Sequence, residues 1–318
     1  SFPLAWNATN FQLPTTNASL GEMLMAFDIS ILANTLVINS NSSVQASGVG
    51  IYTNTTHIAN QSNVSAQGLG CRSKTGLGCG YYDLTLNQLL ACSGTGGSYG
   101  GLGGSSAPDT CTLLAPRRSY GSLVFPTNKG SGGGNPLTNS LSAGGGLIVV
   151  QTYMLSIDTN SEINVDGAGG LFGGGGGSGG SINIQTAFVA GGGQLSAEGG
   201  FGKSSGGGGR ISLQLMLWAN STISQPSSSL ILQVNPGGTN ASSLSSGLNG
   251  SIFTTPCLPG QQLTLQYLCQ SCPGGTFKPS FGYSGCINCS QPPNSLTPSR
   301  NQTCSRVAST TPASKVHR

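Results

Sequence analysis

The sequence predicts an all-β protein: a right-handed parallel β-helix (β-solenoid) followed by a small disulfide-rich module. Three features lead to this prediction: a short phrase that occurs three times, glycine runs between its copies, and six cysteines clustered near the end. Repeats of roughly 20–50 residues are typical of stacked architectures, because one unit buries its apolar face only against the next unit.

The repeated phrase opens with glycines, alternates apolar and variable residues, and reaches a glutamine. Its copies begin at Gly145, Gly179 and Gly208. Alternation over four to six residues indicates a half-buried strand. A second short alternating run follows each copy, at 162–167, 194–199 and 222–225. Each repeat is therefore expected to contain two strands.

Stacked copies place equivalent residues in ladders, with a rise of about 4.8 Å per coil. We expect Ile148, Ile182 and Ile211 to form one buried ladder. The glutamines of the phrase should form another, with amides hydrogen-bonded along the stack; they are Gln151, Gln185 and Gln214. Right-handed crossovers are expected, as for almost all parallel connections.

The glycine runs lie between the expected strands, where glycine suits tight corners and close backbone approach. A phosphate-binding loop would end in Gly-Lys-Ser/Thr and open a helix. Neither feature follows these runs. We therefore expect no nucleotide and no other cofactor.

Composition limits the class of protein. Charged residues make up 6% of the chain and the net charge is +4, with Arg117-Arg118 as the only adjacent basic pair. A nucleic-acid binder would show clustered Lys and Arg, so no nucleic acid is expected. No apolar run reaches the roughly 18 residues of a membrane-spanning helix, so no span is expected in this chain.

Glycosylation sequons point to an extracellular or cell-surface location. Eleven Asn-X-Ser/Thr sequons accompany ten cysteines and very few charges, which together favour a secreted glycoprotein with covalent N-glycans. Asn288 is the weakest candidate because Cys289 follows it. The sequons are at Asn7, Asn17, Asn41, Asn54, Asn60, Asn63, Asn220, Asn240, Asn249, Asn288 and Asn301.

Four cysteines lie in the irregular part of the chain, at Cys71, Cys79, Cys92 and Cys111. Four cysteines allow three pairings, between which the sequence does not choose. Zinc is the alternative, but the spacings contain no C-x-x-C and His57 is the only nearby histidine. We expect two disulfides that pin an insertion at 71–111 to the edge of the coils.

Six further cysteines follow, at Cys257, Cys269, Cys272, Cys286, Cys289 and Cys304. Two C-x-x-C pairs would suit a zinc ribbon, but that leaves Cys257 and Cys304 unexplained. Three disulfides are favoured, because the segment is too poor in apolar residues to form a core. Sequential pairing is our expectation among 15 connectivities, with no bridge to the first cluster.

The expected organisation has four parts. Residues 1–22 are an extended segment that packs on the first coil, and 23–250 form the glycine-rich solenoid. Residues 251–304 form the cysteine-rich module, and 305–318 a Ser/Thr/Pro linker or stalk. Within the solenoid, 28–32 and 43–48 match the two strands, 50–143 is less regular, and 230–234 is one further strand.

Two segments resemble known families. The runs at 179–184, 195–200 and 207–211 resemble the glycine-rich right-handed β-helix of large surface proteins in protists and some bacteria. The Cys-x-x-Cys-Pro-Gly-Gly-Thr-Phe run at 269–277 is similar to the ephrin-receptor-like, TNF-receptor-like cysteine-rich repeat often attached to such helices. The resemblance implies a scaffold and says little about function.

Catalysis is an alternative, because many β-helices act on polysaccharides. Asp166 and Glu198 occupy equivalent strand ends of adjacent coils, as a glycosidase pair could. Carboxylates without a cleft or sugar-binding aromatics do not define a site, so no enzyme is expected. Calcium at Asp158, Glu162 and Asp166 lacks the usual β-roll motif. His57 and His317 are the only histidines, which leaves no credible Ser-His-Asp set.

Two function classes remain: a structural glycoprotein of a coat, fibre or filament, and the ectodomain of an adhesin or receptor-like protein. No sequon lies between Asn63 and Asn220, although sequons crowd both flanks. A glycan cannot occupy a covered surface, and contacts that do not close give filaments. We favour the structural class, with self-association into a homopolymer through the solenoid.

Overall fold

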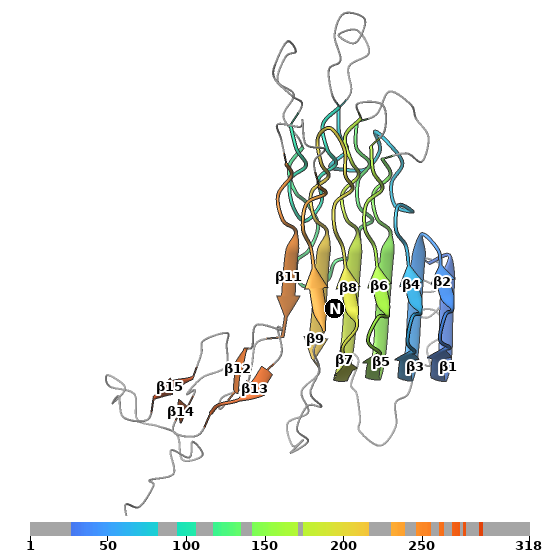
Figure 1. Cartoon of the computed structure of the whole chain (residues 1–318), viewed down its shortest axis with the longest axis vertical. Coiled ribbons are helices and arrows are strands. Elements are labelled where there is room, and N and C mark those ends of the chain that lie inside the picture. The colour runs from blue at the N-terminus through green and yellow to red at the C-terminus, as the bar shows by residue number, and fades with distance from the viewer. Residues whose placement is uncertain are drawn as a thin grey trace, which may run out of the picture. The chain divides into compact units, whose positions relative to one another are not determined.

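The structure is a computed structural model of the chain, shown in Figure 1. It describes residues 27–81, 94–105, 117–134, 142–170, 174–215, 230–238, 246–255, 261–263, 269–273, 276–277 and 286–288. The chain divides into two compact units, Ser1–Thr255 and Pro256–Arg318. The described residues form strands and no helix, which confirms the all-β prediction.

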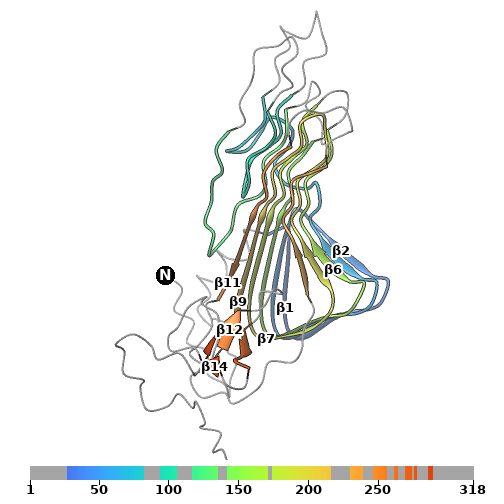
Figure 2. The ribbon, with the colours of Figure 1, turned by 60° about the vertical axis from the view of Figure 1, so that its left-hand side comes forward.

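The first unit contains two parallel sheets, and the chain alternates between them (Figures 1 and 2). The first sheet has the order β1-β3-β5-β7-β9-β11 and the second β10-β8-β6-β4-β2. We call a strand of the first sheet and its successor in the second sheet a rung. The first-sheet strands are β1 (Ile29–Ile38), β3 (Gly48–Ile58), β5 (Leu147–Ile157), β7 (Ser181–Gly191), β9 (Arg210–Leu215) and β11 (Ser251–Thr254). The second-sheet strands are β2 (Ser43–Gln45), β4 (Asn63–Ser65), β6 (Glu162–Asn164), β8 (Gln194–Ser196) and β10 (Ile231–Gln233).

The register of the repeated phrase is confirmed. Ile148 pairs with Ile182, and Ile182 pairs with Ile211. All three side chains are fully buried. The glutamines also align, with Gln185 between Gln151 and Gln214. The expected amide ladder is present for one step only: the Gln151 amide donates to the Gln185 carbonyl at 3.4 Å, whereas the Gln214 amide donates to the Val124 carbonyl at 2.7 Å.

Three expectations about the strands need correction. Residues 48–65 form a full rung, β3 and β4, inside the stretch expected to be irregular. The strand beside β8 is Ile231–Gln233 and not 222–225, which lies outside the described residues. β11 pairs with β9, so the stack extends through Thr255 into the range expected for the cysteine-rich module.

Buried threonines lie where the pairing of the first sheet is interrupted, after Thr53–Thr152 and before Thr55–Met154. Inward positions of β3 are two residues apart up to Thr53 and then three apart to Thr56. Such a break turns backbone carbonyls away from the ladder, and buried carbonyls need partners. The hydroxyl of Thr152 lies 3.2 Å from the Asn54 carbonyl and 3.1 Å from the Met154 carbonyl. Buried hydroxyls therefore supply partners to carbonyls at this interruption.

Beyond the sheets, extended glycine-rich segments run side by side without forming strands. We call 94–104, 130–134, 142–146, 166–170, 174–180 and 198–209 the glycine bundle. Backbone hydrogen bonds join neighbouring segments, such as Gly145 N to Ser178 O at 2.9 Å and Gly207 N to Gly97 O at 2.9 Å. A Cβ on Gly145 would lie 1.7 Å from the Val165 carbonyl oxygen. Glycine is needed here because the backbones touch.

Of the corners between the sheets that the structure describes, glycines make only that of the fourth rung, where Gly191 (φ 98°) opens the run 191–193 between β7 and β8. In the first three rungs the corner residue with left-handed φ is Asn41 (60°), Gln61 (59°) or Asn160 (64°). These residues occupy the same position, two before the second strand of the rung. Asn in particular tolerates this conformation, so a tight corner does not require glycine.

The long insertion between β4 and β5 returns across the outer face of the first sheet. Its segment 117–134, which we call the strap, accepts bonds from β9 through the Tyr120 carbonyl (Arg210 Nε, 3.0 Å) and the Val124 carbonyl (Ser212 Oγ, 2.6 Å). Tyr99 is fully buried, and its hydroxyl lies 2.6 Å from the Ser181 hydroxyl on β7. The strap therefore covers part of the sheet that would otherwise face solvent.

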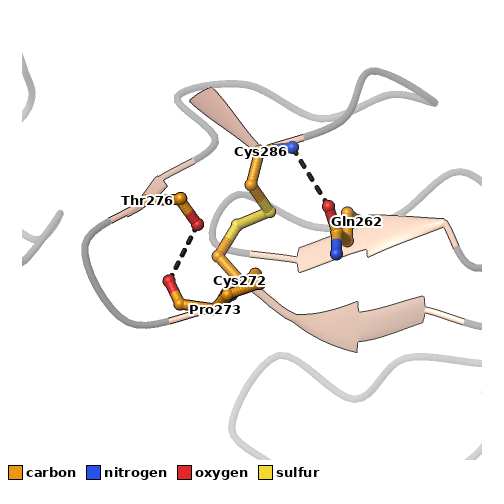
Figure 3. The surroundings of a disulfide bond; sticks show 5 residues. All are labelled: Gln262, Cys272, Pro273, Thr276 and Cys286. Atoms are coloured by element: carbon orange, nitrogen blue, oxygen red, sulfur yellow. Dashed lines mark hydrogen bonds between the residues drawn. A yellow bond between two sulfur atoms is a disulfide. The ribbon is translucent and has the colours of Figure 1, made fainter. Parts of the chain in front are cut away.

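The second unit is described by two short antiparallel pairs. β12 (Gln261–Leu263) pairs with β13 (Cys269–Ser271), and β14 (Thr276–Phe277) pairs with β15 (Ile287–Asn288). A disulfide joins Cys272 to Cys286, as sequential pairing predicts (Figure 3). The pairing of Cys257, Cys269, Cys289 and Cys304 stays a prediction.

Candidate functional site

The two carboxylates considered for catalysis hold adjacent rungs together. Asp166 Oδ1 accepts hydrogen bonds from Ser196 Oγ and from the Glu198 backbone N–H, both at 2.6 Å. Glu198 Oε1 accepts from Asn235 Nδ2 at 2.6 Å. Desolvation raises the pKa of Asp166, against the opposing effect of these bonds. The geometry is that of a polar ladder across three successive rungs.

Asp158 and Asp166, two of the three acids weighed for calcium, each bind a different partner. Asp158 Oδ1 lies 3.0 Å from His57 Nε2, and both side chains are exposed. Asp166 is engaged with the next rung, as described above. Among the described residues no group of three His, Cys, Asp or Glu side chains could hold a metal ion.

The structure places five sequon asparagines. Asn41, Asn60 and Asn249 are exposed. Asn54 and Asn63 are half-buried, and Asn54 Nδ2 donates to Asn34 on the neighbouring strand at 2.5 Å. The other side chains lie outside the described residues: Asn7, Asn17, Asn220, Asn240, Asn288 and Asn301. The described sequons fall on the first two rungs and beside β11, and none falls on the rungs between.

These middle rungs expose apolar side chains. Met154 on β5 is 43% exposed and pairs with Phe188 on β7. The rings of Tyr153 and Phe188 meet edge to face at 5.2 Å. The repeated phrase did not predict these residues, because they lie just after its glutamine. Their signal in the sequence was the presence of large apolar residues at outward positions of the same strands.

Cys71 and Cys79 are free thiols in the structure, not half-cystines as expected. Cys92 and Cys111 lie outside the described residues. The loop between the thiols is already tied to the strap by backbone bonds, Cys71 N to Gly130 O (3.0 Å) and Gly80 N to Gly132 O (2.9 Å). Burial raises the pKa of Cys71, which disfavours its thiolate.

Among the described residues, no strand covers the first edge of the stack, which is made by β1 and β2. Ile29, Ile31 and Leu36 of β1 are only half-buried, although their partners on β3 are fully or almost fully buried. Leu32 and Val37 on the outward face are 47% and 50% exposed. β1 carries no charge and no proline, which are the usual protections of an edge strand.

No family model, no curated protein and no solved structure matches the chain. The described residues contain no helix long and apolar enough to cross a membrane. Function is therefore inferred from the surface of the stack. This surface has exposed sequons at both flanks, and between them lie sequon-free rungs with exposed apolar side chains.

Proposed function

We propose that this protein is an extracellular structural glycoprotein, a subunit of a coat, fibre or filament that associates with copies of itself. In this proposal the alternating parallel sheets are a right-handed parallel β-helix, and the second unit is a cysteine-rich module of the ephrin-receptor-like kind. The carboxylates that could suggest catalysis are engaged in rung-to-rung bonds, which is what a scaffold requires.

The observation that carries the proposal is the distribution of sequons over the stack. Exposed Asn41 and Asn60 lie on the first two rungs and exposed Asn249 beside the last strand. Between them, β5 to β8 carry no sequon and expose Met154 next to the Tyr153–Phe188 pair. Glycans on the flanks leave this middle surface free for protein contacts, and burial of its apolar side chains would favour association.

A single substitution tests this. Met154→Asn completes an Asn-X-Ser sequon with Ser156 on the sequon-free surface. We expect light scattering of the glycosylated wild-type protein to give a mass above that of the monomer. The Met154→Asn protein should be monomeric once mass spectrometry shows its new glycan.

Met154→Gln is the matched control, because it is equally polar but adds no glycan. It should associate more strongly than the glycosylated Met154→Asn protein. A wild-type protein that stays monomeric at all concentrations tested would refute self-association. Equal association of the two variants would place the contact elsewhere on the molecule.

A further inference from the structure

The strap begins with a pair of arginines to which the proposed scaffold assigns no role. Arg117 and Arg118 form the only adjacent basic pair in the chain. Both are exposed, and so is Ser119, which follows them. Arg117 lies over the ring of Tyr81, 5.0 Å from its centroid, and a cation–π contact at an exposed site is weak. Among the described residues no carboxylate pairs with either arginine. The pair therefore presents two positive charges to solvent.

The backbone at this pair has few contacts to lose. Residues 117–119 belong to no strand, and no hydrogen bond joins their backbone to another described residue. Tyr120 is the first residue that is held, with its N–H donating to the Tyr99 carbonyl at 3.1 Å. Proteases cut folded proteins where a segment opens locally at low cost, most often in exposed loops. The Arg118–Ser119 bond meets this condition.

A second Arg–Ser bond in the chain shows the contrast. Arg72 is also exposed, but its carbonyl accepts from Thr75 N at 2.9 Å and from Thr75 Oγ1 at 2.7 Å. Ser73 is 2% exposed, and its hydroxyl donates to the Gly133 carbonyl at 3.0 Å. The Arg72–Ser73 bond is therefore fixed on both sides. An exposed arginine alone does not make its peptide bond accessible to a protease.

A cut after Arg118 would leave the two parts of the molecule bound to each other. β3 lies before the cut and β5 after it, and the two strands pair along their whole lengths. In the glycine bundle, Gly97 N donates to the Gly176 carbonyl at 2.9 Å, which again joins the two parts. The strap itself stays held, because the Tyr120 carbonyl accepts from Arg210 Nε at 3.0 Å. The fold needs no peptide bond at this position.

We propose that Arg117-Arg118 is a processing site for a serine protease specific for basic pairs, which converts the protein into two chains held together by the fold. The proposal goes beyond the structural role but rests on the proposed extracellular location, because such a protease must meet the chain during or after secretion. The reaction is hydrolysis: the bond from the Arg118 carbonyl carbon to Ser119 N breaks and water is added. Arg118 then ends in a carboxylate and Ser119 begins with an ammonium. Carboxylates in the protease subsites would bind the two guanidinium groups.

Two proteases test the site on the folded, full-length protein. A purified subtilisin-like protease specific for basic pairs should make one early cut, giving fragments 1–118 and 119–318 on reducing, denaturing gels. Light scattering of the cut protein should give an unchanged mass. Trypsin needs only a single basic residue, so it isolates the effect of backbone contacts. In the folded protein trypsin should cut at 118–119 at least about a hundredfold faster than at 72–73, and in the denatured protein at similar rates.

Exposed substitutions separate the pair from the single arginine. Arg117→Gln keeps the Arg118–Ser119 bond for trypsin but should slow the pair-specific protease by at least about tenfold, since one charge-assisted contact is lost. Arg118→Gln should abolish the cut between 118 and 119. Arg72→Gln is the matched control and should leave both proteases unaffected. Denaturant unfolding at the wild-type midpoint shows that each variant is folded.

Termini of the protein secreted from eukaryotic cells complete the test. Amino-terminal labelling and mass spectrometry should find chains that begin at Ser119 in the wild type and not in Arg117→Gln. A folded protein that resists the pair-specific protease while the denatured protein is cut would overturn the proposal, as would secreted protein without a Ser119 terminus. Fragments that separate in light scattering would refute the two-chain product. These results do not depend on self-association, which the Met154 variants measure separately.

Discussion

Gly179 in the glycine bundle offers the sharpest test of the packing. A Cβ at this position would lie 2.2 Å from the Ala197 carbonyl oxygen and 2.6 Å from the Gly209 nitrogen, where ordinary contact begins at 3.4 Å. These two atoms are the acceptor and donor of one hydrogen bond, of length 2.7 Å. The methyl group of alanine would therefore be inserted into a bond between neighbouring segments.

The cost follows from the bonds that must break. Relief of the overlap needs a shift of about 1 Å, which breaks the Gly209–Ala197 bond and strains the 3.0 Å bond from Gly179 N to Gly207 O. A buried polar group left without a partner costs about 1–3 kcal/mol. Two affected bonds give about 2–6 kcal/mol of lost stability, a fall in Tm of roughly 5–20 °C.

Gly238→Ala is the matched control, because a Cβ there meets nothing within 4 Å. Alanine reduces the entropy of the unfolded chain, so this variant should be about 0.4–1 kcal/mol more stable than wild type. Denaturant unfolding followed by circular dichroism measures both. If Gly179→Ala unfolds at the wild-type midpoint, the close backbone contact does not exist and the reasoning fails.

Three further predictions concern the core, a carboxylate and the cysteines. Ile182→Ala should lower the free energy of unfolding by about 2–5 kcal/mol, because it opens a cavity between Ile148 and Ile211. Ile231→Ala is the control, because this side chain is 51% exposed, and it should lower the free energy of unfolding far less. Equal decreases in the two variants would contradict the buried ladder. Because desolvation raises the pKa of Asp166 above 3.8, the folded state holds its proton more tightly, so this group lowers stability as pH rises from 3.8 through the raised value. Asp166→Asn should remove that loss, since its side-chain oxygen still accepts from Ser196 and Glu198; unfolding curves between pH 3 and 7 that match wild type would refute the assignment. Non-reducing peptide maps should recover Cys272–Cys286 and no bridge between the 71–111 and 257–304 clusters, and a cross-cluster peptide would show that the two units are covalently joined.

The sequence by itself determined the strands that carry the repeated phrase and which of their side chains face inward. Alternation is a local property, so Ile148, Ile182 and Ile211 could be aligned without coordinates, and the structure pairs them in that register. The rung at 48–65 does not follow from the repeated phrase, because its 20-residue spacing is shorter than the 34 and 29 residues that separate Ile148, Ile182 and Ile211. The 20-residue spacing from Ile29 to Val49 was its signal.

The carboxylates show where sequence reasoning stops. Sequence placed Asp166 and Glu198 at equivalent positions, which is correct. Only the structure showed that Asp166 accepts the Glu198 N–H and that Glu198 binds Asn235. Whether a carboxylate is free for chemistry depends on donors supplied by other rungs, and those are not adjacent in sequence.

The glycines show even more clearly that local sequence does not reveal contacts between distant segments. Local rules assign glycine to corners, yet Asn41, Gln61 and Asn160 make the corners of the first three rungs. Gly145 and its neighbours lie instead in extended segments. The local sequence of a glycine run does not predict which backbone segment lies beside it. That neighbour is a distant segment, brought alongside by the stacking of the sheets, and only the tertiary structure decided that a side chain there would have no room.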